Sequence, residues 1–175
     1  MPRPIRFELV AELPQSPQEI AALILDLDQW PNFEGWGPLP GIRRAAFEHR
    51  AERIVGSRIR CENTDNSAHT EHILVWDPAR ELRLRLDTFS RPLSLLASYF
   101  EEAWLFEPGR PGQPTRAKRT FELHPRSAVT RPLVWVIGRL LRKAIQAQLK
   151  QLARGEPRGG SAGSGEGESY SSSTK

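Results

Sequence analysis

The chain has 175 residues, 38% of them hydrophobic, and a net charge of +4 at neutral pH. Its length suits one domain, and its single cysteine, Cys61, excludes an intrachain disulfide and argues against a metal site built from cysteines. The positive charges form no long run, which disfavours nucleic acid as a partner.

The first predicted elements are a strand and a capped helix. Apolar and polar residues alternate over residues 5–13, a pattern typical of a half-buried strand. The sequence SPQE at residues 16–19 has the residues of a capping box, with proline at the first helical position. An apolar stripe then predicts a helix that ends near residues 30–31, because the residue before proline avoids the helical conformation.

This helix leads into an aromatic stretch, DLDQWPNFEGW, at residues 26–36. Aromatic rings are costly to leave in water, so they belong either to a core or to the wall of a cavity. We expect Trp30 to pack against the helix and the sheet as core. For Phe33 and Trp36, core and cavity lining are equally consistent with the sequence.

Six further strands are predicted in the middle of the chain. They cover residues 42–50, 57–64, 69–76, 81–88, 99–107 and 115–124. Short connections, such as the turn at residues 77–80, predict antiparallel neighbours. The longer apolar link at residues 90–98 is consistent with a bulge, a short helix or a flap.

The strand at residues 99–107 has two different faces. Phe100, Glu102, Trp104 and Phe106 share one face, because successive side chains of a strand alternate. Turning this face inward buries more apolar area, and it makes Glu102 a polar group inside an apolar cavity. The alternative is an outward Glu102, with the opposite face of the strand turned inside.

A long amphipathic helix is predicted from about Thr130 to Gly155. The residues that follow are almost entirely Gly, Ser and charged residues, which have too little apolar surface to offset their ordering entropy. We therefore expect a disordered tail at residues 155–175, either native or derived from a linker, and one domain at residues 1–154.

Together these elements predict an α+β fold. A curved antiparallel sheet of about six to seven strands would wrap around the long helix, with one or two short helices after the first strand. The matching segments are SPQEIAALILDLDQWPNFEGW, WDPARELRL, FEPGRPGQPTRAKRTFEL and the closing helix, in that order. In these segments the chain resembles the START-like superfamily, also called SRPBCC, with its helix-grip fold, and most closely its polyketide cyclase/dehydrase and lipid-transport branch.

The resemblance implies a cavity between sheet and long helix that holds apolar or amphipathic small molecules. It implies no single activity, because members include carriers and enzymes, and it provides no catalytic motif that maps onto this chain. Residues expected to line the cavity and bind the ligand are Phe33, Trp36, Trp76, Phe100, Trp104, Phe106, Leu133, Ile137 and Leu141.

Acid–base chemistry in such a cavity would need an ionisable pair, for which Glu102 and His72 are the candidates. His72 falls on the strand face of Thr70, Leu74 and Trp76, and the alternative is an ordinary surface histidine. No H-x-H or H-E-x-x-H pattern occurs, and no glycine-rich phosphate loop, so neither a metal nor another cofactor is predicted.

Three functions remain open at this point. The leading hypothesis is binding or carriage of a hydrophobic or amphipathic small molecule. The second is a cyclase- or dehydrase-type enzyme acting on a polyketide-like or aromatic substrate. The third is a module that contacts a protein or membrane surface, because the long helix has a basic face and residues 92–97 are apolar. No segment is apolar enough for a signal peptide or a membrane span, so a soluble cytoplasmic protein is expected.

Overall fold

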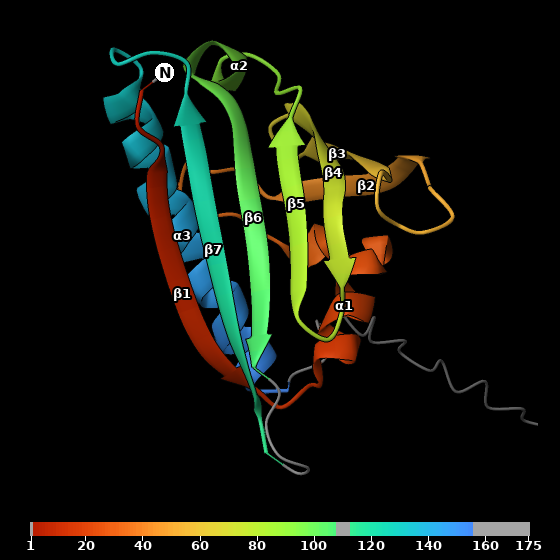
Figure 1. Cartoon of the computed structure of the whole chain (residues 1–175). Helices are drawn as coiled ribbons and strands as arrows, with labels where there is room; N and C mark the ends of the chain where they lie inside the picture. The colour runs from red at the N-terminus through yellow and green to blue at the C-terminus, as the bar shows by residue number, and fades with distance from the viewer. Residues whose placement is uncertain (1, 108–112, 156–175) are drawn as a thin grey trace, which may run out of the picture.

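A seven-stranded antiparallel sheet curves around one long helix in the computed structural model of the chain (Figure 1). The structure describes residues 2–107 and 113–155, so the expected tail lies outside the described residues except for Gly155. The strands are β1 (Ile5–Leu13), β2 (Ile42–His49), β3 (Arg58–Asn63), β4 (Ala68–Asp77), β5 (Glu81–Asp87), β6 (Ala97–Glu107) and β7 (Thr115–Pro125). The helices are α1 (Pro17–Leu25), the 3-10 helix η1 (Leu27–Asn32), α2 (Leu93–Leu96) and α3 (Arg131–Ala153). The predicted α+β helix-grip fold is confirmed.

The sheet has the strand order β1-β7-β6-β5-β4-β3-β2. Strands β2 to β7 are neighbours in chain order, as their short connections predict. β1 instead pairs with the last strand, from Ile5 opposite Leu123 to Leu13 opposite Thr115. Helix α3 packs across β1 and β7, on the same side of the sheet as α1 (Figure 1).

The capping box expected before the first helix is present. Ser16 Oγ accepts from the Glu19 backbone amide at 3.3 Å, and Glu19 Oε2 accepts from the Ser16 amide at 2.7 Å. The aromatic stretch then forms η1, with Pro31 inside it. A tight turn follows, in which the backbones of Trp36 and Leu39 exchange hydrogen bonds.

Two hydrophobic clusters make up the core. The larger cluster joins α1 and α3 to β1, β6 and β7, with Leu13, Ile20 and Leu123 fully buried or nearly so. The smaller cluster joins η1 to β2, β3 and β4 around Ile59 and Ile73. Trp76 packs against both clusters, so it links the two parts of the core.

Helix α3 covers the sheet with one face and leaves apolar residues exposed on the other. Val134 and Ile145 are buried against the sheet side, whereas Leu133, Trp135 and Val136 in its first half are exposed. The helix contains no acidic residue. Among the described residues, no helix combines the length and the apolar character needed to span a bilayer.

Candidate ligand-binding site

A cavity of about 420 Å³ lies between the sheet and the helices α1, η1, α2 and α3. This volume falls within the range of small-molecule sites, roughly 300–1,000 Å³. The cavity is where the two hydrophobic clusters separate, since residues of both contribute to its wall. Apolar lining residues from the helices are Ile20, Leu23, Ile24, Trp30, Leu93, Leu96, Ile137, Leu140, Leu141, Ile145 and Leu152.

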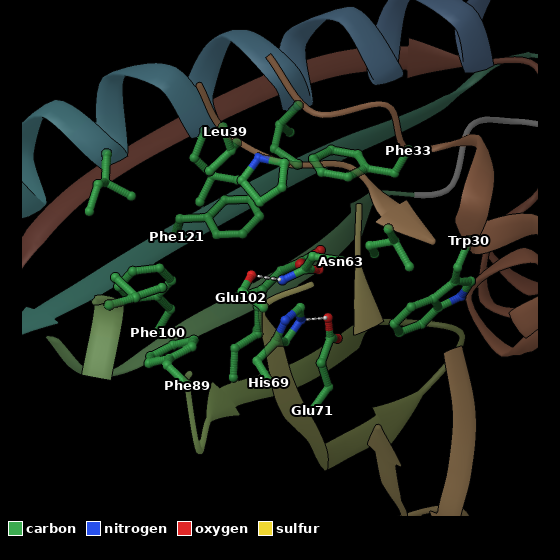
Figure 2. Close-up of a pocket in the computed structure, with 18 of the residues that line it drawn as sticks. Trp30, Phe33, Leu39, Asn63, His69, Glu71, Phe89, Phe100, Glu102 and Phe121 are labelled. Carbon is green, nitrogen blue, oxygen red and sulfur yellow. Dashed lines mark hydrogen bonds and ion pairs between the residues drawn. The ribbon is translucent and has the colours of Figure 1, made fainter. Parts of the chain in front are cut away.

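The sheet side of the cavity is aromatic. Phe100 and Trp104 from β6 and Phe121 from β7 line it, and Phe89 contributes from the segment before α2 (Figure 2). The rings of Phe89 and Phe100 are tilted against each other, with centroids 4.9 Å apart. These rings provide a rigid apolar surface for a flat or elongated ligand.

One buried polar group interrupts this surface, and we call it the Glu102–Arg119 pair. Arg119 Nε donates to Glu102 Oε1 at 2.7 Å, and Arg119 Nη1 donates to Gln148 Oε1 at 2.6 Å. The indole N–H of Trp104 also donates to Glu102 Oε1, and the guanidinium lies 4.5 Å from the centroid of the Trp104 ring. The opposite charges and the hydrogen bonds between them offset the cost of burying both groups.

A second polar group lies on β3 and β4, and we call it the Cys61–His69–Glu71 cluster. His69 Nε2 lies 3.2 Å from Glu71 Oε1, and the Cys61 thiol donates weakly to the same oxygen at 4.0 Å. His69 and Glu71 line the cavity (Figure 2), whereas Cys61 is fully buried in the smaller cluster. Burial, and secondarily the charge of Glu71, raises the pKa of the Cys61 thiol far above its usual value, so the thiol is protonated.

The cavity brings together six of the residues singled out in the sequence. They are Phe33, Phe100, Glu102, Trp104, Ile137 and Leu141. Five others lie outside its lining, namely Trp36, His72, Trp76, Phe106 and Leu133. We therefore do not expect these five side chains to contact a molecule bound in this cavity.

Of these five residues, Phe106 is buried elsewhere in the core, and Trp36 and Leu133 are exposed. Phe106 is on the predicted inner face of β6 but is buried in the larger cluster, where its ring stacks on Trp104 with centroids 6.1 Å apart. Trp36 is 44% exposed in the turn after η1. Leu133 is 55% exposed, because it lies on the outer side of the first turns of α3.

His72 and Trp76 are separated by an irregularity in β4. Ile73 pairs with Leu84 and Val75 with Arg83, so Leu74 is an extra residue in the strand. This bulge puts Trp76 on the inner face with Ile73 and leaves His72 on the outer face. There His72 Nε2 contacts Asp87 Oδ1 at 2.9 Å, which corrects the expectation that His72 shares the face of Trp76 and meets Glu102 in a cavity.

Sequence reasoning missed His69, Glu71, Arg119 and Gln148 as lining residues. The alternation of β7 could have identified Arg119, since it lies two residues from the inward Phe121. His69 and Glu71 likewise alternate with the inward Ile73. Gln148 is on the apolar stripe of α3, and a polar residue in that position is itself a signal of a buried partner.

Comparisons with known proteins identify the family of the chain. The family model described as polyketide cyclase / dehydrase and lipid transport matches residues 4–155. No curated protein matches the sequence.

Solved structures share the fold at low sequence identity. The Zhui aromatase/cyclase from Streptomyces sp. R1128 matches with a TM-score of 0.62 and 12% identity, over 87% of this chain and 93% of that one. The major latex-like protein 151 from Panax ginseng matches with a TM-score of 0.61 and 9% identity, over 86% and 99%. A START superfamily protein from Mycobacterium smegmatis matches with a TM-score of 0.57 and 14% identity, over 84% and 98%.

Proposed function

Because the chain belongs to the polyketide cyclase / dehydrase and lipid transport family, we propose that it binds and carries a hydrophobic or amphipathic small molecule. The observation that carries this proposal is the apolar cavity of about 420 Å³ between the sheet and α3. A space of this volume inside a protein core would ordinarily be filled by side chains, because voids lower the stability of the fold. A cavity kept open between two hydrophobic clusters therefore favours a bound molecule.

The lining favours a ligand with an apolar body and a few oxygen or nitrogen atoms. The aromatic surface around Phe100 and Phe121 suits a ring system or an acyl chain. The Glu102–Arg119 pair, with Gln148, offers hydrogen bonds at one place in that surface. A hydroxyl, carbonyl or carboxylate of the ligand would pair with these groups.

The enzymatic alternative is a cyclase- or dehydrase-type reaction, as the name of the Streptomyces relative suggests for that protein. In this chain the expected pair is separated, because His72 lies on the outer face of the sheet with Asp87. The carrier function needs no acid–base pair, and it is the one that the lining supports best.

Native mass spectrometry of the purified protein tests the proposal, followed by titration with an environment-sensitive apolar dye. We expect a co-purifying molecule or saturable binding of the dye. Leu141→Trp should fill the cavity and abolish dye binding without unfolding the protein, whereas Trp36→Ala should leave binding unchanged, since Trp36 is exposed outside the lining. Equal dye binding by folded Leu141→Trp would refute the cavity as the binding site, and turnover of the co-purified molecule would favour the enzyme.

A second function, docking on an anionic membrane surface, is favoured by the first half of α3. Leu133, Trp135 and Val136 are exposed there, and Arg139 lies over the Trp135 ring at 5.2 Å from its centroid. No Asp or Glu occurs from Pro125 to Gly155. Exposed apolar side chains among basic ones are typical of helices that lie at the surface of anionic bilayers.

Co-sedimentation with vesicles tests this second function. We expect binding to phosphatidylserine-containing vesicles, weaker binding to phosphatidylcholine vesicles, and a loss of binding in Trp135→Ser. Trp36→Ser is the matched control, because Trp36 has a similar exposed fraction at a different place in the chain. Equal binding by Trp135→Ser and wild type would contradict docking through α3, and a concentration-dependent dimer that Trp135→Ser abolishes would assign this face to a second copy of the chain instead.

A further inference from the structure

The Cys61–His69–Glu71 cluster has the composition of a metal site. Its thiol, imidazole and carboxylate ligand atoms all lie within 4.8 Å of one another. We propose that these three side chains bind a divalent transition-metal ion in the wall of the cavity, with Zn²⁺ as the metal that suits them best. Cys, His and Glu are all ordinary zinc ligands, and the mixture of sulfur, nitrogen and oxygen disfavours Mg²⁺ and Ca²⁺, which prefer oxygen alone.

The distances between the ligand atoms fit a tetrahedral ion. With zinc bonds of about 2.0–2.3 Å, two ligand atoms of one tetrahedron are roughly 3.3–3.8 Å apart. His69 Nε2 and Glu71 Oε1 are 3.2 Å apart, and Cys61 Sγ and Glu71 Oε1 are 4.0 Å apart. Both distances are near the tetrahedral values, and the ligand atoms of the third pair, Cys61 and His69, lie within 4.8 Å, so side-chain rotations that bring these atoms closer by at most about 1 Å would admit the ion.

The backbone of the sheet positions all three residues. Cys61 on β3 is directly opposite His69 on β4, and Glu71 follows His69 two residues along the same strand. Residues separated by two positions in a strand point to the same face, as do residues directly opposite each other on paired strands. The three side chains therefore converge on the inner face without any contribution from a loop.

Charge balance also favours a divalent ion at this place. Glu71 contributes one negative charge, and the Cys61 thiol becomes a thiolate when its proton passes to solvent on metal binding. With neutral His69 binding through Nε2 and carrying its proton on Nδ1, the two negative charges neutralise a doubly charged ion. A neutral complex is the form that a largely buried site tolerates at least cost.

Three protein ligands leave one tetrahedral position open. His69 and Glu71 line the cavity while Cys61 lies behind them in the smaller cluster, so the fourth position faces the cavity. Three-ligand zinc sites of this kind bind water or a ligand oxygen in that position. If the proposed carrier function holds, the metal would take an oxygen of the carried molecule; metal binding itself does not depend on that function.

Cobalt substitution and metal analysis test the site. Untagged protein is stripped with a chelator, dialysed against Zn²⁺ or Co²⁺ and analysed by elemental mass spectrometry. We expect about one ion per chain, and for Co²⁺ a thiolate-to-metal charge-transfer band in the near ultraviolet together with visible bands of four-coordinate cobalt. Glu71→Gln should lower the affinity by roughly tenfold or more, because even second-shell changes have effects of that size.

Two further variants make the test specific. Cys61→Ser should abolish the charge-transfer band, and His72→Gln should change nothing, because His72 is on the outer face with Asp87. Absence of the band in wild type, or an undiminished band in folded Cys61→Ser, would overturn the proposal. If Cys61→Ser does not fold, unchanged Zn²⁺ affinity in Glu71→Gln overturns it equally. Dye binding by the metal-free protein tests the carrier function separately.

Discussion

Arg119 and Glu102 form an ion pair in the wall of the cavity, with Nε and Oε1 2.7 Å apart and each side chain only 10% exposed. The two residues lie on β7 and β6, and Gln148 of α3 accepts a further hydrogen bond from the guanidinium. The pair therefore connects the sheet to the long helix across an apolar space. Burying both charges is costly, and their hydrogen bonds and mutual attraction offset that cost.

We predict that Arg119→Met destabilises the protein by about 3–5 kcal/mol, because it leaves the Glu102 carboxylate buried without its oppositely charged partner, with only the Trp104 indole N–H donating to it. The double variant Glu102→Gln/Arg119→Met should recover much of this loss, since it leaves no unpaired charge. Urea unfolding of the wild type, both single variants and the double variant gives the coupling free energy. Additive losses in the double variant would contradict a coupled pair.

Phe100 and Phe106 are a matched pair on one face of β6, and only Phe100 lines the cavity. Phe106→Ala should lower the free energy of unfolding by about 3–5 kcal/mol, as for a large aromatic in a packed core, and leave dye affinity per folded molecule unchanged. Phe100→Ala should cost less stability, because its ring already faces open space, and should weaken dye binding. The reverse result would mean that the lining is wrongly assigned.

Two glycines should respond to alanine in opposite directions. A Cβ at Gly138 inside α3 would lie 3.5 Å from Ile5 Cγ2 and Leu123 Cδ2, an ordinary contact. Gly138→Ala should therefore stabilise the protein by roughly 0.5–1 kcal/mol through helix propensity. Destabilisation by this variant would show that α3 packs more tightly on β1 and β7 than these distances indicate.

At Gly35, φ is +78° and a Cβ would lie 2.1 Å from the Leu39 carbonyl oxygen. Gly35→Ala should lower the free energy of unfolding by more than about 1–2 kcal/mol, the cost of the left-handed backbone alone. Thermal unfolding of both alanine variants against wild type measures the two effects. A neutral Gly35→Ala would mean that the turn after η1 can rearrange freely.

The capping box of α1 should make stability depend on pH. Hydrogen bonds from the Ser16 backbone amide, and then from its hydroxyl, hold the pKa of Glu19 below its usual value. A carboxyl group with a lowered pKa stabilises the folded state above its unfolded pKa, and this contribution is lost as the pH falls through the folded pKa. The difference in Tm between wild type and Glu19→Ala should therefore be largest near neutral pH and shrink in acid. A difference independent of pH would contradict an ionised cap.

The regular elements could be predicted because their patterns are local. The alternation in β6 indicated that Phe100, Glu102 and Trp104 share a face, and the structure places that face inside. The same rule failed for Trp76, which it placed on the face of His72, because the bulge at Leu74 shifts the later residues of β4 by one position. Nothing in the sequence around residues 69–76 marks that bulge, since it depends on how β4 pairs with β5.

The candidate site was only partly predictable for a related reason. An apolar stripe shows that a helix has a buried side but not where that side ends, so Leu133 and Ile137 were grouped although only Ile137 reaches the cavity. The Cys61–His69–Glu71 cluster depends on the register of β3 against β4. A count of one cysteine cannot reveal that a histidine lies opposite it.

The division of the core into two hydrophobic clusters has a consequence for how the protein opens. The smaller cluster holds β2, β3 and β4 to η1, while the larger one holds β1, β6 and β7 to α3. Amide hydrogens of the two regions should exchange with solvent at different rates, and β5 couples the regions, because it pairs with both β4 and β6 and has Leu82 in the larger cluster and Leu84 in the smaller one. A molecule that fills the cavity touches residues of both clusters. Its arrival would couple the two regions more strongly and slow the exchange of both, including at amides far from any contact with the molecule itself.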